Sequence, residues 1–376
     1  MLLLIAAFAV SLFATLLIVR SAKLHAHLTS DHDVAGPQKF HASPVPRIGG
    51  VGIVLGLLVA AAMLWITDHA SARSGLLLLL CGVPAFGAGL IEDLTKSVSP
   101  RVRLLSVAVS ALLALWWVNA AITETDIPGL DWVVATAAGS ALVTIFAVAG
   151  IANSVNIIDG FNGLASMCVV IRLAAVAYVA FQVNDPEIGL LGLVGIGAVL
   201  GFFVWNFPGG MIFLGDGGAY FLGFYVAELS ILLLVRNSEV SPLFPLLVCI
   251  YPVFETVFSI YRRRFLRAVP PSMPDGIHQH SLIYRRLLRW AVGDRSARAL
   301  IRRNSKTSPF LWALCMISVV PAVLFWDSTA VMAVSLALFA FGYVLLYWSI
   351  VRFRSPRWLR RLASRPMPLR DDNRRT

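Results

Sequence analysis

Charged residues are scarce in this chain of 376 amino acids: Asp, Glu, Lys and Arg together make up 14% of it, whereas hydrophobic residues make up 58%. A soluble fold of this length needs a larger polar fraction than that. The scarcity of charge therefore excludes a soluble globular protein. It predicts a polytopic integral membrane protein of the all-α class, in which each crossing takes about 20 apolar residues.

Cysteine is scarce as well. The four cysteines, Cys81, Cys168, Cys249 and Cys315, lie inside apolar runs, and no two of them have CxxC spacing. We therefore predict neither a disulfide framework nor a zinc site. The chain also lacks a folded basic domain, so its net charge of +11 does not predict nucleic-acid binding. Attraction to the anionic headgroups of membrane lipids is a simpler role for these basic residues.

About eleven apolar runs are long enough to cross a bilayer. They cover residues 2–19, 49–66, 75–91, 104–121, 132–149, 164–182, 188–206, 217–235, 241–261, 309–326 and 330–351. We expect a single transmembrane domain over residues 1–351 and a basic tail over 352–376. Lys and Arg concentrate in the odd-numbered connections and in the tail, which predicts that the N-terminus lies outside and the C-terminus lies in the cytoplasm. The polar loops 20–48, 92–103, 150–163, 207–216 and 262–308 would then be cytoplasmic.

The most unusual polar segment is NSVNIIDGFNGLA, between two apolar runs. In it Asn153, Asn156, Asp159 and Asn162 recur at every third residue, a spacing that gathers their side chains on one side of a helical turn. Gly160 and Gly163 let the backbone bend or approach a ligand closely. The alternative interpretation is a hydrated loop without a function.

Glu92 and Asp93 are adjacent carboxylates at the end of the third run, with Lys96 about one turn further on. Adjacent carboxylates repel each other, so a divalent cation, a lysine-bound phosphate or a shared proton is a natural partner. The alternative is an ordinary hydrated helix end in which Lys96 forms an ion pair with one of the acids.

Asp216 lies in the sequence GDGG, which predicts a flexible glycine turn around one carboxylate before the next helix begins. Asn206 and Pro208 end the preceding helix. Asp216 is then either an N-cap residue or a contact for a phosphate or a metal ion.

Lys39 and Arg47 flank the second run, where they either anchor the helix end or bind phosphate. His278 and His280 are two residues apart, on opposite faces of a strand or splayed in a turn. Phosphate recognition is favoured over a transition metal because no third nitrogen or sulfur ligand is evident, and a solvated basic loop is the alternative. Two charges within apolar runs, Arg172 and Glu228, lie at similar depth and are predicted to pair.

The polar segments fall on one predicted side of the membrane, and they offer acids and amides without soft ligands. Such a set suits a hard ion such as Mg²⁺, while the basic residues suit phosphates. A transporter would place its polar residues near the midplane on broken helices.

Five segments in order, KFHASPVPRIGG, EDLTK, NSVNIIDGFNGLA, WNFPGGMIFLGDGG and YPVFETVFSIYRRR with PDGIHQH, resemble the polyprenyl-phosphate N-acetylhexosamine-1-phosphate transferase family. The resemblance spans nearly the whole chain. Five positions depart from the family pattern: Glu92 stands where the first of two aspartates is usual, Asn162 and Glu255 stand for Asp, Ala219 stands for Ser, and Ser281 ends the HxHH-type motif.

The resemblance implies an enzyme that transfers an N-acetylhexosamine 1-phosphate from a UDP-N-acetylhexosamine to undecaprenyl phosphate and releases UMP. It implies Mg²⁺ or Mn²⁺ as the cofactor, and a homodimer is an assembly that it allows. Asp93, Glu92 and Asp216 would be catalytic, with Asp216 and Asn156 on the metal. The substrate-binding residues would be Lys39, Arg47, Lys96, Asn153, Asp159, Asn162, Asn206, His278 and His280. The basic tail favours the branch that starts O-antigen-type glycans; the alternatives are a phospho-MurNAc-pentapeptide transferase and a non-catalytic lipid-phosphate transporter.

Overall fold

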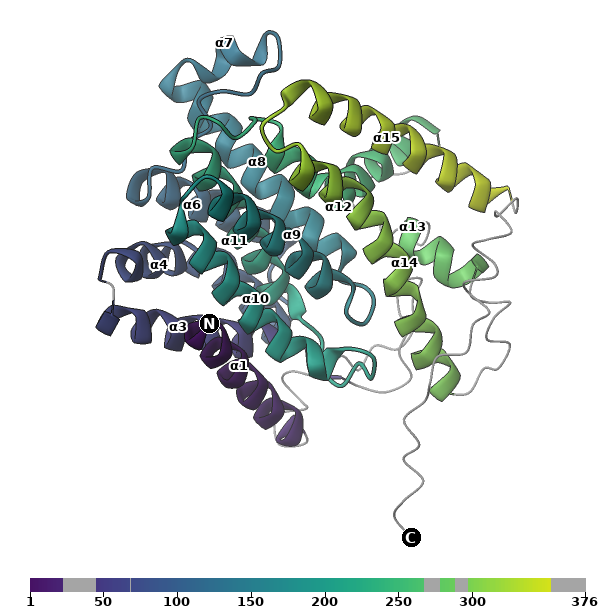
Figure 1. The fold of residues 1–376 in the computed structure, drawn as a ribbon. Coiled ribbons are helices and arrows are strands. Elements are labelled where there is room, and N and C mark those ends of the chain that lie inside the picture. Colours follow the sequence, from purple (N-terminus) through teal and green to yellow (C-terminus); the bar gives the residue numbers. More distant parts are fainter. Residues whose placement is uncertain (23–44, 68, 267–277, 288–296, 353–376) are drawn as a thin grey trace.

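The computed structural model describes residues 1–22, 45–67, 69–266, 278–287 and 297–352 (Figure 1). All regular elements within these ranges are helices, which confirms the predicted all-α class. The helices are α1 (Leu2–Arg20), α3 (Gly49–Thr67), α4 (His69–Cys81), α5 (Val83–Thr95), α6 (Pro100–Trp117), α7 (Leu130–Val134), α8 (Ala137–Ile158), α9 (Leu164–Gln182), α10 (Pro186–Asn206), α11 (Gly215–Arg236), α12 (Phe244–Tyr261), α13 (Gln279–Leu282), α14 (Ala297–Leu324) and α15 (Thr329–Val351). Two short π-helical segments, η1 (Arg262–Leu266) and η2 (Ile283–Leu287), lie on either side of α13 in the sequence.

Within the described ranges, ten helices are long and apolar enough to cross a membrane, and each corresponds to a predicted run. The remaining predicted run, 75–91, falls on α4 and α5, which are bent by 44° relative to each other. Pro84 lies in the first turn of α5 and has no backbone N–H, so the helical hydrogen bonding is interrupted there. This bent pair makes one broken span or a re-entrant loop.

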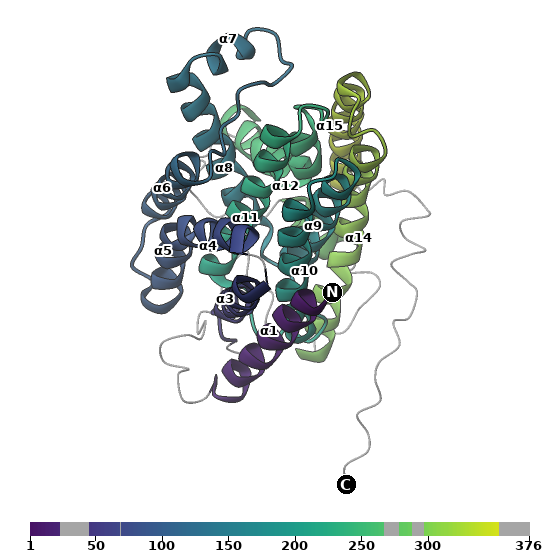
Figure 2. The ribbon, with the colours of Figure 1, turned by 60° about the vertical axis from the view of Figure 1, so that its left-hand side comes forward.

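Helix α11 lies at the centre of the bundle. Of the residues in its apolar 18-residue stretch, 89% are buried. The corresponding share is 17% in α1 and in α15, which lie at the periphery. Helices α3, α5, α8 and α9 pack around α11, while α1 packs on α3 and α10 (Figure 2). A residue at the end of α11 therefore sits where several other helix ends also meet.

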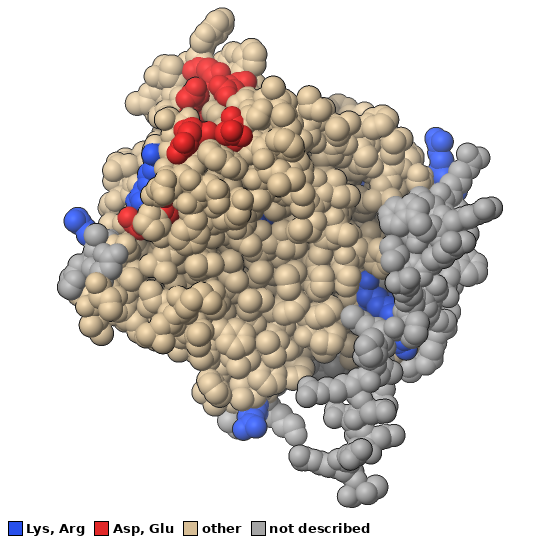
Figure 3. Space-filling model, viewed as in Figure 1, with Lys and Arg blue, Asp and Glu red and all other residues tan. Residues whose placement is uncertain are grey.

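Charged side chains are distributed unevenly over the surface. The face seen in Figure 3 is largely uncharged across its middle, as expected of a surface that contacts lipid, and acidic side chains gather at the end of the molecule that carries α7. The connection around α7 contributes Glu124, Asp126 and Asp131.

The predicted pairing of Arg172 with Glu228 is wrong for the described part of the chain. Both side chains are fully buried, and neither has a hydrogen-bond partner there. Arg172 interacts electrostatically with Cys168, Cys249 and Cys315. Glu228 interacts electrostatically with Cys81. Similar depth along two helices did not place the charges on facing sides.

Candidate active site

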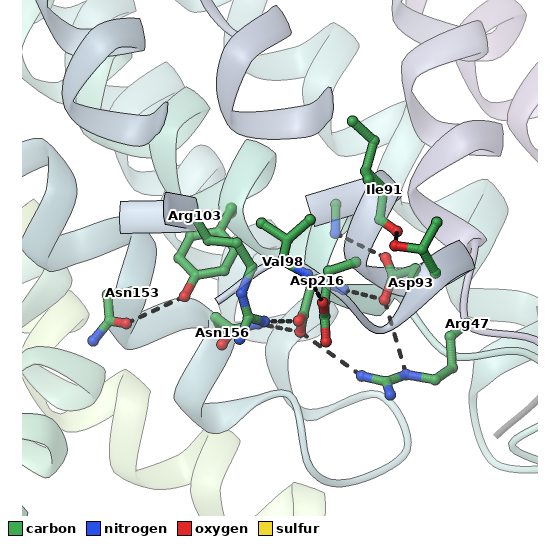
Figure 4. A network of polar contacts seen from close by, with 12 residues as sticks. Arg47, Ile91, Asp93, Val98, Arg103, Asn153, Asn156 and Asp216 are labelled. Atoms are coloured by element: carbon green, nitrogen blue, oxygen red, sulfur yellow. Dashed lines mark hydrogen bonds and ion pairs between the residues drawn. The ribbon is translucent and has the colours of Figure 1, made fainter. Parts of the chain in front are cut away.

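Five segments that are distant in the sequence meet at the N-terminal end of α11. They are the end of α5, the start of α6, the end of α8, the start of α11 and the segment that leads into α3. Figure 4 shows the polar network that they form, with Asp216 at its centre and Arg47, Asp93, Arg103 and Asn156 around it. These residues come from both sides of the central helix, so the network exists only in the folded bundle.

Asp93 caps the first turn of α11. Its Oδ1 accepts a hydrogen bond from the Asp216 N–H and its Oδ2 accepts one from the Gly217 N–H, each at 2.9 Å, and the residue is 2% exposed. A carboxylate at this position satisfies N–H groups that have no partner within the helix and interacts favourably with the helix dipole. Asp93 therefore fixes the orientation of the helix end that carries Asp216.

The predicted flexible glycine turn is wrong, because Gly215 to Gly218 form the first turn of α11 itself. Gly215 has a φ of +78°, and a Cβ atom there would lie 1.8 Å from the Arg47 carbonyl oxygen and 2.5 Å from Asp93 Oδ2. Only glycine fits such a close approach with this backbone conformation. The glycines thus allow the helix end to pack against its neighbours rather than making it flexible.

Asp216 is held by one amide and two guanidinium groups. Its Oδ1 accepts a 2.8 Å hydrogen bond from Asn156 Nδ2, and its Oδ2 accepts one from Arg103. Arg47 bridges the two aspartates: its Nη2 lies 3.8 Å from Asp216 Oδ1, and its Nε lies 3.9 Å from Asp93 Oδ1. The structure therefore brings Arg47, Asp93, Asn156 and Asp216 together, as the sequence predicts.

Arg103 was missed by the sequence analysis as a site residue. It lies in the first turn of α6, which Ser99 caps by accepting a hydrogen bond from the Val102 N–H. A cation is unfavourable at a helix N-terminus, and this position is the signal that would have identified Arg103. Its guanidinium also lies 5.8 Å from the centre of the Tyr220 ring, whose hydroxyl donates to Asn153 Oδ1 at 3.4 Å. Asn153 is thereby linked to the cluster through Tyr220.

Asp159 adds a third carboxylate at the end of α8. It is partly buried, and it interacts electrostatically with Arg47 and Asp93. Desolvation raises the pKa of Asp159 from 3.8 to about 7, against the opposing effect of Arg47. When all are ionised, three carboxylates and two guanidiniums give this group of residues a net charge of about −1.

Glu92 and Lys96, which are also predicted as site residues, lie at the end of α5 and directly after it. Glu92 Oε2 accepts a 2.6 Å hydrogen bond from the Val98 N–H, so this carboxylate holds the connection between α5 and α6. Lys96 is exposed in a left-handed conformation, with a φ of 54°, directly after α5. Lys39 lies outside the described residues.

His278 and His280 form a second polar group around α13. Their rings are stacked, with centroids 5.1 Å apart, so the predicted splayed arrangement is wrong. Glu255 of α12 organises this turn: its Oε1 lies 3.2 Å from His278 Nδ1 and accepts a 2.7 Å hydrogen bond from the Gln279 N–H. The His280 ring contacts that of Phe161 at 5.4 Å, which joins the group to the loop between α8 and α9.

The side-chain nitrogen of Asn162 and both polar side-chain atoms of Asn206 form hydrogen bonds inside the protein. Asn162 Nδ2 donates to the Pro208 carbonyl at 3.0 Å. Asn206 accepts from the Gly163 N–H at 2.6 Å and donates to the Ile212 carbonyl at 2.7 Å. The two asparagines therefore connect loops that lead to Asp159 and Asp216.

No cluster of three or more His, Cys, Asp or Glu side chains with a metal-binding arrangement is found in the residues that the structure describes. The acidic side chains at α11 face guanidinium groups and an amide instead. The arrangement can hold anionic groups through Arg47 and Arg103, and it offers only oxygen ligands to a cation.

The fold and these side chains define a polytopic membrane protein whose charged site is built where several helix ends meet the N-terminal end of α11. Residues 75–234, which include most of that site, match Glycosyl transferase family 4. The chain is 29% identical to a probable undecaprenyl-phosphate N-acetylglucosaminyl 1-phosphate transferase of Bacillus subtilis, over 77% of this chain and 79% of that protein.

Two further relatives extend the comparison. An undecaprenyl-phosphate alpha-N-acetylglucosaminyl 1-phosphate transferase of Thermotoga maritima is 28% identical over 67% of this chain and 72% of that protein. A phospho-N-acetylmuramoyl-pentapeptide-transferase of Geobacillus kaustophilus is 30% identical over 50% of this chain and 61% of that protein. These matches confirm the resemblance to the polyprenyl-phosphate N-acetylhexosamine-1-phosphate transferase family.

Proposed function

We propose that this protein transfers an N-acetylhexosamine 1-phosphate from a UDP-N-acetylhexosamine to undecaprenyl phosphate, releases UMP, and so starts a lipid-linked glycan of the cell envelope. The reaction takes place at the cytoplasmic face of the bacterial inner membrane. The names of the relatives support the reaction type. The observation that carries the proposal is the buried cluster of Asp216, Asp93, Arg47 and Arg103 at the end of α11.

The length of the matched regions favours the N-acetylglucosaminyl branch over the peptidoglycan branch. The two N-acetylglucosaminyl 1-phosphate transferases match over 77% and 67% of the chain, and the pentapeptide transferase over 50%. The end of α15 also lies on the side of the histidine group, because Arg286 donates to the Ile350 carbonyl at 3.3 Å. This contact supports a cytoplasmic location for the end of α15, while the predicted basic tail beyond residue 352 lies outside the described residues.

A divalent cation fits the donor set. When its three carboxylates are ionised, the cluster carries a net charge of about −1 before a diphosphate enters, so a cation would balance the added negative charge. Asp159 supports this view, because it is a desolvated carboxylate with no hydrogen bond in the described part of the chain. Asp216 and Asn156 would hold Mg²⁺ or Mn²⁺, which would supply charge neutralisation at the diphosphate.

The reaction itself needs positioning more than proton transfer. An oxygen of the lipid phosphate attacks the β-phosphorus of the UDP-sugar, and the bond to the bridging oxygen breaks as UMP leaves with the electron pair. Because a phosphate monoester has its second pKa near 6, the acceptor is mostly dianionic at pH 7. Asp93, committed to two backbone N–H groups, thus serves to place Asp216, while Arg47 and Arg103 bind phosphate oxygens.

The test is UMP formation by the purified protein in lipid vesicles, with undecaprenyl phosphate and a panel of UDP-N-acetylhexosamines. We expect UMP with one or more donors, dependence on added Mg²⁺ or Mn²⁺, and loss of turnover on chelation. A transporter would move the lipid without producing UMP. Absence of UMP with every donor, from protein that is folded and inserted, would reject the proposed function.

A further inference from the structure

One face of α14 contacts the loop between α8 and α9. Asn304, Ser308 and Trp312 recur at every fourth residue, which places them on the same face of the helix. We call these three residues, with the neighbouring Ser305, the α14 latch. Asn304, Ser305 and Ser308 are at most 2% exposed. Buried polar side chains at the end of a membrane-crossing helix are costly unless they are paired, so their partners indicate their role.

The partners are backbone groups of two consecutive residues. The Asn162 N–H donates to Asn304 Oδ1 at 2.8 Å, and the Ser308 hydroxyl donates to the Asn162 carbonyl at 2.6 Å. The Trp312 indole N–H donates to the Gly163 carbonyl at 3.0 Å. One helix face therefore holds three consecutive peptide groups at the point where the chain turns from α8 into α9.

The latch also fixes the second loop, which leads to α11. The Ser305 hydroxyl donates to the Pro208 carbonyl, and this oxygen also accepts from Asn162 Nδ2. The Trp312 ring packs against that of Phe207, with centroids 5.0 Å apart. The two loops deliver Asp159, three residues before Asn162, and Asp216, eight residues after Pro208.

The turn at Gly163 leaves no room for adjustment. Gly163 has a φ of +71°, and a Cβ atom there would lie 2.8 Å from side-chain atoms of Phe203 and Phe207. Its carbonyl and its N–H are both bonded, to Trp312 and to Asn206. A loop held at this many points keeps one geometry, and a carboxylate carried by such a loop is pre-organised.

The start of α14 extends the connection to the histidine group. Arg303 Nε donates to the Tyr284 carbonyl at 2.7 Å, and the guanidinium lies 4.1 Å from the centre of the Tyr284 ring. The Phe161 ring contacts the rings of Tyr284 and His280, at 5.5 and 5.4 Å. Helix α14 thus touches three of the segments that carry candidate site residues: the loop between α8 and α9, the loop before α11 and the segment around the histidine group.

We propose that the α14 latch positions the phosphoryl-transfer site, and that Asn162 and Asn206 act with the latch rather than as contacts for the nucleotide. The inference rests on the proposed function for its kinetic consequences. Its structural part stands on the hydrogen bonds alone. Loss of one latch bond shifts the loops, and the shift misplaces Asp159 and Asp216 relative to Arg47, so the chemical step slows while substrate binding is retained.

The kinetic test compares Ser308→Ala with Ser318→Ala. The control removes another buried hydroxyl of α14, which donates to the Cys315 carbonyl at 2.9 Å. With UDP-N-acetylglucosamine and undecaprenyl phosphate, we expect Ser308→Ala to lower kcat about tenfold or more, because small misplacements slow chemistry strongly. KM for either substrate should change less than about threefold, since binding groups remain. Ser318→Ala should stay within about twofold of the wild type in both parameters.

A second pair removes an indole N–H without removing the bulk of the ring. Trp312→Phe loses the bond to Gly163, and Trp205→Phe loses a bond of equal length, 3.0 Å, to the Leu12 carbonyl on α1. Only Trp312→Phe should lower kcat. Equal kcat in the members of each pair would overturn the proposal, as would a Ser308→Ala variant that raises KM for the UDP-sugar about tenfold at unchanged kcat.

Hydrogen–deuterium exchange provides a readout that does not depend on turnover. Amides of residues 159–163 should exchange faster in Ser308→Ala than in Ser318→Ala, and those of α15 should exchange equally in both. If the wild type produces no UMP, the proposed function is rejected and this measurement still decides on the latch. Equal exchange of residues 159–163 in both variants would overturn the latch.

Discussion

Helix α11 has an arginine and acid cluster at each end, and the two clusters differ in burial and in the contacts of their charges. We call the N-terminal end of α11, at Asp216, the inner end and its C-terminal end, at Arg236, the outer end, after the proposed orientation. At the inner end, the side chains of Asp93, Asp216 and Arg103 are between 1% and 13% exposed. At the outer end, Arg236 lies 3.1 Å from Glu187 and 3.8 Å from Asp185, and its side chain is 34% exposed.

The charges at the outer end have ordinary structural roles. Asp185 caps α10 by accepting from the Ile188 N–H at 3.1 Å, and Arg236 ends α11, where a cation is favourable. At the inner end, Arg103 begins a helix, where a cation is unfavourable, and Asp216 shares its two oxygens among Asn156 and two arginines. The same residue types thus stabilise helix ends on one side and form a more deeply buried polar network on the other.

The largest expected difference between the two ends concerns Asp216. Asp216→Asn should lower kcat by about 10³-fold or more, because it removes the negative charge that, in the proposed function, would hold a divalent cation at the diphosphate. Asp185→Asn at the outer end should leave kcat within about twofold. UMP release by both purified variants measures the difference, and a fully active Asp216→Asn variant would defeat the assignment of the site.

The second largest loss of activity is expected at Arg103. Arg103→Met should lower kcat/KM by about 10²-fold, because a buried charge-assisted contact is lost while the apolar stem is retained. The matched control is Arg101→Met, two residues earlier in the same helix turn, where the side chain is exposed. If both variants behave alike in steady-state kinetics, Arg103 does not belong to the site.

Asp93 should combine a loss of stability with a smaller loss of activity. Asp93→Asn leaves one of two backbone N–H groups at α11 without an acceptor, which we expect to cost about 2 kcal/mol of unfolding free energy and about tenfold in kcat. Asp131→Ala removes the carboxylate oxygen, Oδ1, that accepts from both the Thr125 N–H and the Thr125 hydroxyl, at 2.8 and 2.6 Å. Thermal unfolding and UMP assays should show destabilisation in both variants but a loss of activity only in Asp93→Asn.

The inner cluster should also show a pH dependence that the outer one lacks. The pKa of Asp159 is raised from 3.8 to about 7 by desolvation. Its contribution to the free energy of unfolding therefore stabilises the folded state at low pH and is lost as the pH rises through about 7. The melting temperature of the ligand-free wild type should therefore fall, relative to that of Asp159→Asn, between pH 5 and pH 8. Parallel pH profiles of the two proteins would show that Asp159 is not desolvated as described.

The smallest effect is expected at the outer end. Glu187→Gln breaks a partly exposed ion pair with Arg236, and such pairs contribute about 0 to 1 kcal/mol. Thermal unfolding should shift little, and kcat should stay within about twofold of the wild type. A large loss of activity in this variant would mean that the two ends of α11 are coupled.

The sequence predicts the membrane crossings well because hydrophobicity is a local property. The predicted run 75–91 differs from the other runs because Pro84 in the first turn of α5 interrupts it. The residues around Asp216 were predicted as a turn, since Gly, Asp and Gly favour turns locally. Their helical conformation depends on a cap from Asp93, 123 residues away, and such tertiary contacts override local propensity.

Part of the candidate site was predictable because the ends of apolar runs can be found from local hydrophobicity. Arg47, Asp93, Asn156 and Asp216 stand out as polar residues at the ends of apolar runs, and the structure brings them together. The hydrogen bond from the Asn162 N–H to Asn304 Oδ1 joins residues that are 142 positions apart, and nothing in the local sequence indicates it. The side-chain amide nitrogen of Asn162 donates to the Pro208 carbonyl, 46 residues away, so the fold uses internally a group that the sequence predicts as a substrate contact.

The most direct test of the account follows the β-phosphate. With UDP-N-acetylglucosamine labelled at the β-phosphorus, purified protein and undecaprenyl phosphate, the account predicts that the label enters the lipid-extractable product. Unlabelled UMP should be released in equal amount. Release of labelled UDP, or a lipid product that carries the sugar without the label, would contradict the transfer of a sugar 1-phosphate at the inner end of α11.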